Sequence, residues 1–341
     1  MKTACMRLSL FKEVGSLKVS RKMVNKQLRF RGMLISRLVQ KSSEAKFIES
    51  MQNSKKQMEK SFKGKDVEGL DCREVWIARK DGTKIRVRIY RPLGQNRALP
   101  GVLWIHGGGY AQGVPEMSGN MYKRLIEASD CVIVAPDYRL SIDAPYPAAF
   151  EDCYEVLLWM KNHAAELGIR DDQLMIGGES AGGGLTAALT LYARDQGTVN
   201  IAFQMPLYPM IDDRMRTKSA CDNNAYVWDS KTNGWAWGLY LGELFGREVP
   251  IYAAPARALD YSNLPLTVTF VGDIEPFRDE TVRYVENLEK AGVPVDFRMY
   301  KGAYHGFDII HPKAKISIAA TKFLMKSFNY ATKHYFAEQD N

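Results

Sequence analysis

The sequence predicts an α/β protein in which a mostly parallel central sheet is covered by helices on both faces. Short, continuous apolar runs that suit buried strands alternate with amphipathic stretches that suit helices. The length of 341 residues fits one large domain or two modest ones. A composition of 46% hydrophobic and 25% charged residues excludes wholesale disorder, collagen and coiled coil.

The expected sheet begins with a hairpin and continues as βαβ units. Alternating apolar residues at 75–77 and 84–90 flank Asp81-Gly82, which is a favoured hairpin turn. Beyond Pro100, strands are expected at 102–105, 132–135, 174–176, 201–205, 266–271 and 295–300. Helices are expected between them at 122–128, 148–163, 185–194 and 279–290. This alternation predicts parallel strands joined by crossover helices.

Positive charge is concentrated in the first fifth of the chain. Residues 1–65 hold 17 Lys and Arg against 4 Asp and Glu, whereas the remainder holds 30 against 35. Apolar residues in this extension recur at helical spacing, which favours helices packed on the rest of the protein over a membrane tether or a targeting peptide. The two apolar stripes are Val24, Leu28, Ile35 and Val39, and Phe47, Met51, Met58 and Phe62. No aromatic residues are interleaved as in a nucleic-acid platform, so we expect no nucleic-acid partner.

The cysteines and the hydropathy pattern bear on location. The five cysteines are scattered, odd in number and never in a CxxC pair, so we expect reduced thiols and no zinc site. No stretch reaches the ~18 apolar residues that a membrane span requires. The basic N-terminal region lacks the apolar core of a secretory signal. We therefore expect a cytoplasmic protein without stable membrane insertion.

The pentapeptide Gly178-Glu179-Ser180-Ala181-Gly182 has the GxSxG pattern of a nucleophile elbow. It stands between the expected strand at 174–176 and an expected helix, which is the strand–turn–helix context that such an elbow requires. Its glycines allow a tight, strained turn in which larger side chains would clash. The following helix points its positive end toward developing negative charge. We therefore expect Ser180 to be a nucleophile.

A run of three glycines, Gly107, Gly108 and Gly109, follows His106 and the expected strand at 102–105. Glycines leave backbone N–H groups unshielded, so an oxyanion can approach them closely. A phosphate cradle would require a lysine and Ser or Thr at fixed offsets, which this segment lacks. We expect His106 to support the loop rather than to act as a base.

A serine nucleophile requires a base and an acid. His305 follows the expected strand at 295–300 and so occupies the carboxyl end of a strand, which makes it the best base, with His311 as runner-up. The acid is expected on the loop after the strand at 266–271, where four carboxylates compete. The residue types alone leave both Asp273 and Glu275 open.

Together these motifs resemble the hormone-sensitive-lipase-like esterases of the α/β-hydrolase fold, a group that includes bacterial carboxylesterases and arylacetamide deacetylases. The HGGG run at 106–109, the GESAG elbow at 178–182 and the order serine, acid, histidine match this family. The segment at 137–149 is similar to the family's DYRLAPExPFPAA segment. The resemblance covers residues 71–335 and implies a mostly parallel central sheet flanked by helices, with a helical cap.

The resemblance also implies roles for individual residues. The family's acid motif DPLRDE lines up without a gap with residues 275–280, which implies Glu275 as the acid and leaves Asp273 as the alternative. Glutamate can hold the Nδ1–H of His305 and stabilise the imidazolium as aspartate does. The N–H groups of Ala181 and of the glycine run (Gly107, Gly108 and Gly109) are expected to hold the oxyanion.

The domain organisation follows from these expectations. Residues 66–341 are expected to form the catalytic domain, and the basic extension at 1–65 is expected to form part of the cap. Residues 211–255 break the alternation of strands and helices and predict a cap insertion. The residues expected to wall the substrate pocket are Tyr110, Tyr226, Trp228, Trp235 and Trp237.

The expected function is hydrolysis of carboxylic esters of short to medium acyl chains through an acyl-enzyme on Ser180, with no metal or organic cofactor. One alternative is a deacetylase acting on acetylated sugars or other small acetyl esters. An alternative of another class is a non-catalytic small-ligand receptor of the same fold, but related receptors lose the histidine that is His305 here. The expected partner is a small-molecule ester, and the edge strand at 293–300 is a candidate homodimer contact.

Overall fold

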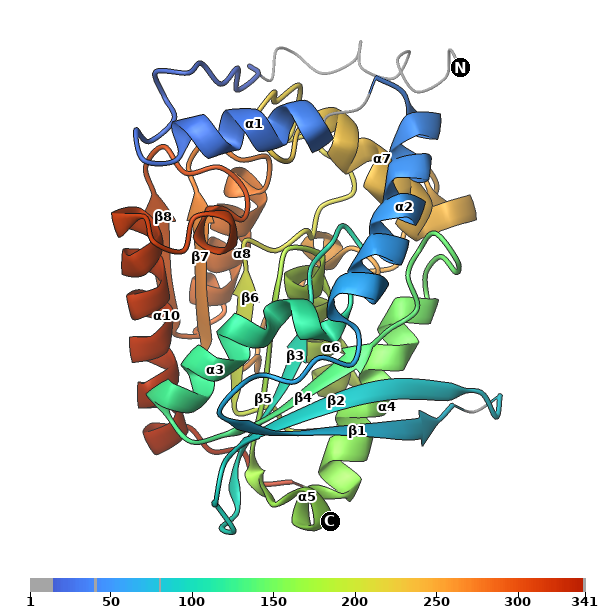
Figure 1. Cartoon of the computed structure of the whole chain (residues 1–341), viewed down its shortest axis with the longest axis vertical. Coiled ribbons are helices and arrows are strands. Elements are labelled where there is room, and N and C mark those ends of the chain that lie inside the picture. Colours follow the sequence, from blue (N-terminus) through green and yellow to red (C-terminus); the bar gives the residue numbers. More distant parts are fainter. Residues whose placement is uncertain (1–14, 40–41, 80, 340–341) are drawn as a thin grey trace.

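The computed structural model describes residues 15–39, 42–79 and 81–339. The strands in this part of the chain are β1 (Leu70–Ala78), β2 (Lys84–Pro92), β3 (Leu99–Ile105), β4 (Val132–Asp137), β5 (Ile169–Glu179), β6 (Phe203–Leu207), β7 (Thr267–Gly272) and β8 (Val295–Tyr300). They form an eight-stranded sheet in the order β1-β2-β4-β3-β5-β6-β7-β8 (Figure 1). β2 pairs antiparallel with both β1 and β4, whereas all pairs from β4 to β8 are parallel.

Helices cover both faces of the sheet (Figure 1). In the described ranges they are α1 (Arg29–Val39), α2 (Glu44–Phe62), α3 (Gly119–Ala128), α4 (Ala148–Asn162), α5 (Ala164–Leu167), α6 (Ala181–Gln196), α7 (Ser230–Leu241), α8 (Arg278–Lys290), α9 (Phe307–Ile310) and α10 (Lys315–His334), with short 3₁₀ turns at Pro115–Ser118, Gly242–Leu244 and Pro255–Arg257. Alternate residues of β3 serve opposite cores: Val102 packs with α3 and α10, whereas Leu103 packs with α4 and α6. The sheet is therefore buried on both sides.

The predicted α/β class and each predicted strand and helix are confirmed, with small shifts in bounds. β6 covers 203–207 rather than 201–205, and α6 begins at Ala181 rather than near Leu185. Gly182, Gly183 and Gly184 lie inside α6, because the start of the helix is in close contact with the ends of β3 and β6. A Cβ added at Gly182 would lie 2.0 Å from the carbonyl oxygen of Ile105.

The described part of the N-terminal extension contains α1 and α2, which lie with α7 at one end of the sheet, opposite α5 (Figure 1). The apolar stripes are buried only in part. Val24 and Leu28 are buried in turns that precede α1, and Val39 is exposed. In α2, Phe47 is buried and its ring lies 5.7 Å from the ring of Trp235 in α7. Residues 1–14 lie outside the described part.

The cysteines in the described residues are not paired. Cys131 and Cys153 are buried, and Cys72 and Cys221 are partly buried, all as free thiols. Cys5 lies outside the described part of the chain. Among the helices that the structure describes, none has the length and apolar character needed to cross a membrane.

Candidate active site

Ser180 occupies a sharp turn between β5 and α6, with φ of 58° and ψ of −116°. A positive φ in a residue with a side chain is strained and persists only where the surroundings enforce it. Here the Ser180 N–H donates to the carbonyl of Leu207 at 3.0 Å. A Cβ at Gly178 would lie 2.5 Å from the carbonyl oxygen of Ile105, and one at Gly182 would lie 2.0 Å from the same atom. Both elbow glycines are therefore required by close backbone contact.

Three side chains from three strand ends form a continuous hydrogen-bonded chain. The Nε2 of His305 lies 2.8 Å from the Oγ of Ser180, and its Nδ1 lies 2.5 Å from the Oε2 of Glu275. Glu275 is fully buried, and its Oε1 accepts the N–H of Gly272 at 2.8 Å. The carboxylate is thus fixed by backbone and accepts the proton on Nδ1. That leaves Nε2 able to accept the proton of the Ser180 hydroxyl.

The other candidate acid and base take different positions. Asp273 accepts the N–H of Gly302 at 2.6 Å, and burial raises the pKa of its carboxyl group. The contact with His305 is made by Glu275, two residues further on. His311 follows α9, and burial lowers its pKa. Of the two candidate histidines, only His305 lines the cavity next to Ser180.

The glycine run borders the same cavity. Gly108 and Gly109 have φ of 122° and 60°, and a Cβ at Gly108 would lie 2.0 Å from the carbonyl oxygen of Gln112. Within the described part of the chain, the N–H groups of Gly108, Gly109 and Ala181 donate no hydrogen bond. These donors beside Ser180 are therefore available to an oxyanion.

His106 supports this loop, as expected. Its Nδ1 lies 2.8 Å from the carbonyl oxygen of Gly107, and its ring stacks on Tyr138 with 4.2 Å between centroids. Burial lowers the pKa of His106, so the ring is neutral at pH 7.

The cavity has a volume of about 330 Å³. Ser180, His305 and the glycine run line it together with further polar residues, among them Asn120 and Arg124 of α3, and most of its exposed surface is apolar. The apolar lining includes Met117, Met121, Val227, Trp228, Ile309 and Pro312. A mostly apolar cavity with several polar groups in its lining suits a small organic ligand.

The aromatic residues expected to wall this cavity require a correction. Trp228 lines it, and its ring lies 6.2 Å from the ring of His305. The four others are not among its lining residues: Tyr110, Tyr226, Trp235 and Trp237.

These four rings pack against protein instead. Tyr110 stacks on Tyr240 with 3.8 Å between centroids, and its hydroxyl donates to a backbone carbonyl at 2.8 Å. Trp237 is fully buried beside the same two rings. Trp235 contacts α2, and Tyr226 lies 6.1 Å from the ring of Tyr304. These contacts pack residues 226–240 against Tyr110, against Phe47 of α2 and against Tyr304 in the loop before His305.

Two carboxylates in the cavity lining were not predicted. Glu179 accepts the indole N–H of Trp104 at 3.1 Å, and burial raises its pKa to about 8. Asp308 is 2% exposed, and burial raises its pKa to about 6. Both stand directly in motifs: Glu179 precedes Ser180, and Asp308 follows His305 by three residues. Their positions next to Ser180 and His305 in the sequence were the signal that could have indicated a place in the cavity lining.

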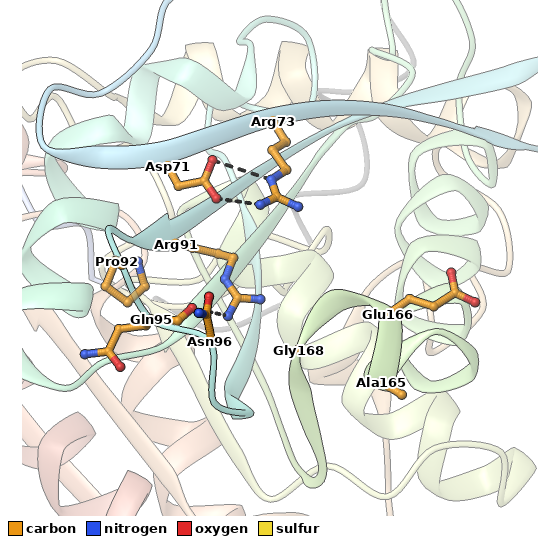
Figure 2. Close-up of a pocket in the computed structure, with 10 residues that line it drawn as sticks. Asp71, Arg73, Arg91, Pro92, Gln95, Asn96, Ala165, Glu166 and Gly168 are labelled. Carbon is orange, nitrogen blue, oxygen red and sulfur yellow. Dashed lines mark hydrogen bonds and ion pairs between the residues drawn. The ribbon is translucent and has the colours of Figure 1, made fainter.

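A second hollow, of about 270 Å³, is lined by residues of β1 and β2, of the loop that leads into β3, and of α5 and the turn that leads into β5 (Figure 2). Its two arginines bond to other groups of the protein. Arg73 donates to Asp71 at 2.8 Å, and Arg91 donates to the backbone carbonyls of Leu167 at 2.5 Å and Gln95 at 3.1 Å. No group of three or more His, Cys, Asp or Glu within the described ranges could hold a metal ion.

Comparisons with known proteins give a consistent result. Residues 102–309 match a family described by the alpha/beta hydrolase fold. The chain is 33% identical over 226 residues to Esterase LipI of Mycobacterium tuberculosis, covering 65% of this chain and 71% of that protein. It is 31% identical over 228 residues to an arylesterase of Saccharolobus solfataricus, covering 66% and 73%. A bacterial heroin esterase has a similar structure, with a TM-score of 0.82 at 29% identity over 92% of this chain and 99% of that one.

Proposed function

The chain belongs to the alpha/beta hydrolase fold family, within its hormone-sensitive-lipase-like group, and we propose that it is a carboxylic ester hydrolase with Ser180 as nucleophile. The observation that carries this proposal is the hydrogen-bonded chain from Ser180 through His305 to Glu275. The Ser180 end of this series of hydrogen bonds lies in a mostly apolar cavity. Backbone N–H donors that have no partner in the described residues lie beside it.

The residues act in two acyl-transfer steps. His305 takes the proton of Ser180 through Nε2, and the serine oxygen attacks the ester carbonyl. The N–H groups of Ala181 and of the glycine run, chiefly Gly108 and Gly109, hold the oxyanion. The imidazolium, stabilised by Glu275, then protonates the leaving alcohol. A water molecule repeats these steps on the acyl-enzyme and releases the acid.

The size of the cavity favours short to medium acyl chains. Its volume of about 330 Å³ is near the lower end of the ~300–1,000 Å³ range of small-molecule sites. The acyl chain and the alcohol must share this space with the reacting atoms. We therefore expect rates to fall for long acyl chains.

The test is hydrolysis of p-nitrophenyl acetate, butyrate, octanoate and palmitate, with labelling by a fluorophosphonate that reacts only with an activated serine. The wild-type protein should hydrolyse the shorter esters and carry the label on Ser180. The Ser180→Ala variant should lose the label and at least ~10³-fold in kcat, with an unchanged melting temperature. An unlabelled wild-type protein that binds esters without turnover would favour the receptor alternative.

We further propose where in the cell the protein acts and which strand forms a homodimer contact. The free thiols of the described residues are consistent with a cytoplasmic location.

β8 is an edge strand, with one side open to pairing, and is the candidate homodimer contact. Sedimentation of the wild-type protein beside a variant with Pro in the middle of β8 tests this contact.

A further inference from the structure

The cavity beside Ser180 contains buried polar atoms that lack partners. In folded proteins the large majority of buried polar atoms are hydrogen-bonded, so each exception calls for an explanation. Among the described residues that line this cavity, the buried side-chain atoms without a partner are His106 Nε2, Gln112 Oε1 and Asp308 Oδ1.

All three atoms are hydrogen-bond acceptors. The Nδ1 of His106 lies 2.8 Å from the carbonyl oxygen of Gly107, which can only accept, so Nδ1 carries the proton of the neutral ring. Its Nε2 is therefore an acceptor, as are the amide oxygen of Gln112 and the carboxylate oxygen of Asp308. A ligand that satisfies these atoms must bring hydrogen-bond donors.

Asp308 is the charged member of this set, and it lies on the His305 side of the cavity. It is the second residue of α9 and follows His305 by three positions. Its Oδ2 is 3.4 Å from the hydroxyl of Tyr208, and the ring of Tyr208 packs edge-on against His305 with 5.1 Å between centroids. The carboxylate also accepts a hydrogen bond from the backbone N–H of Asp308 itself, and Oδ1 is the oxygen that has no partner in the described residues.

Two other buried carboxylates differ from Asp308 in position or in bonding. Glu280 also has one unpartnered oxygen in the described part of the chain, but its Oε1 accepts the N–H of Ile211 at 2.9 Å, and Glu280 does not line the cavity. Glu179 lines the cavity, but it is bonded to Trp104 at 3.1 Å and to Ser118 at 3.3 Å. Asp308 alone of the three combines a position in the lining with an unpartnered oxygen.

We propose that Asp308 forms a subsite for a hydrogen-bond donor, a hydroxyl or a protonated amine, on the alcohol part of the ester substrate. The inference rests on the proposed function, because the position of the alcohol follows from the role of His305. His305 must protonate the leaving oxygen, so the alcohol departs on the side where Asp308 lies. The substrate class is therefore a carboxylic ester of a polyol or of an amino alcohol.

The electrostatics of the cavity agree with this subsite. Burial raises the pKa of Asp308 to about 6, so the group is ionised at neutral pH although it is desolvated. A donor from the substrate would replace the lost water contacts. Hydrogen bonds to charged groups are the stronger kind, and one made in an apolar cavity gives substantial discrimination.

The test uses a matched series of butyrate esters at pH 7.5. 2-Hydroxyethyl and 2-(dimethylamino)ethyl butyrate carry a donor on the alcohol, whereas 2-methoxyethyl butyrate carries none. For each donor ester, kcat/KM is divided by the kcat/KM of the methoxy ester. This ratio is then divided by the ratio of the hydroxide-catalysed rate constants of the same two esters, which removes the difference in their intrinsic reactivity. We expect the wild-type protein to prefer one of the donor esters over the methoxy ester by about 10-fold or more. The preferred ester identifies the donor as neutral or cationic.

In Asp308→Ala this preference should fall to within about twofold of unity, and in Asp308→Asn, which keeps an acceptor oxygen but loses the negative charge, it should weaken. A purely structural role of Asp308 would lower the rates for all three esters by the same factor and leave the ratio unchanged, which would overturn the proposal. The Asp71→Asn variant, in the other hollow, is the matched control and should keep the wild-type ratio.

Failure of the inference is distinguishable from failure of the proposed function. A wild-type protein that hydrolyses p-nitrophenyl butyrate and shows no corrected preference for either donor ester overturns the subsite alone. A wild-type protein that hydrolyses no ester overturns the proposed function and the subsite with it. Because the wild-type ratio is informative by itself, the test stands even where the Asp308 variants do not fold.

Discussion

The two hollows of this molecule lie at opposite ends of the same parallel strands, and they differ in how their polar groups are bonded. At the amino ends of β3 and β5, Arg73 is paired with Asp71, and Arg91 is bonded to backbone carbonyls (Figure 2). At the carboxyl ends, Asp308 has an oxygen without a partner in the described residues, and N–H groups of the glycine loop have none either.

Size does not separate these hollows, because their volumes are about 270 and 330 Å³. What separates them is strain and unsatisfied hydrogen bonding. A protein tolerates such costs where they serve a ligand. The carboxyl ends of parallel strands are also where loops can bring together side chains from several strands. Of the two hollows, the one at the carboxyl ends therefore combines backbone strain at Ser180 with polar groups that lack partners in the described residues.

The largest expected effect is on the acid. Glu275→Gln should lower kcat by about 10⁴-fold, because glutamine would not stabilise the imidazolium of His305 and would favour the wrong tautomer. Asp273→Asn and Asp71→Asn should each change kcat less than about threefold. Steady-state kinetics with p-nitrophenyl butyrate measure all three. A larger loss in Asp273→Asn than in Glu275→Gln would contradict the assignment of the acid.

The second prediction concerns the two sets of glycines. Gly108→Ala should lower kcat by about 10²–10³-fold, because its Cβ would lie 2.0 Å from the carbonyl oxygen of Gln112 and would displace the oxyanion donors. Gly94 lines the other hollow with φ of 71°, and nothing lies within 4 Å of an added Cβ. Gly94→Ala is therefore a matched control for backbone strain and should keep its activity. Equal losses in the two variants would mean that strain alone lowers activity.

The third prediction concerns α2, which packs at the end of the sheet that carries the cavity. Phe47 is 1% exposed against Trp235, so Phe47→Ala should cost about 3 kcal/mol of unfolding free energy. Phe30→Ala, at a position 70% exposed, should change it by less than about 0.5 kcal/mol. Urea denaturation measures both.

If α2 forms part of a cap, Phe47→Ala should also shift the acyl-chain preference in the p-nitrophenyl ester series. An unchanged preference together with the loss of stability would leave α2 a structural role only.

The smallest expected effect is the dependence of stability on pH. Because the pKa of Asp308 is raised from its usual value of 3.8 to about 6, the folded protein holds this proton more tightly than the unfolded chain does. The stability contributed by protonated Asp308 is complete below about pH 4 and is lost as pH rises through about 6. The unfolding free energy of Asp308→Asn should therefore exceed that of wild type by on the order of 1–3 kcal/mol at pH 7.5 and should equal it at pH 4.

The charged and titratable neighbours that could share this effect are Tyr208, Glu275, Glu179 and His305. Asp71→Asn provides the comparison, because its carboxylate is paired at the surface and its loss should not stabilise the fold. Urea denaturation at pH 4, 6 and 7.5 gives the measurement. An Asp308→Asn variant less stable than wild type at pH 7.5 would mean that the carboxylate is a net structural contact.

The positions of the eight strands and of α3, α4, α6 and α8 were predictable from local pattern alone. Continuous apolar runs mark strands buried on both faces, and this pattern does not depend on which neighbour a strand has. The roles of Ser180 and His305 were predictable from the sequence for a related reason. A nucleophile elbow requires glycines at fixed offsets, and a histidine after a strand reaches the active edge whatever the strand order. Glu275 followed only from the family's motif, since Asp273 stands in the same loop.

The cavity lining was decided by tertiary structure. Tyr110 and Trp237 are residues of a type that often lines a pocket, yet they are buried against Tyr240, because the surroundings of a ring depend on how α7 packs on the rest of the protein. Asp308 looks in the sequence like an ordinary polar residue after a turn. Its significance arises only when folding buries the carboxylate, leaves one oxygen without a partner and places it beside His305. Local sequence fixes spacing along a chain, whereas burial and hydrogen bonding belong to atoms that only the folded chain brings together.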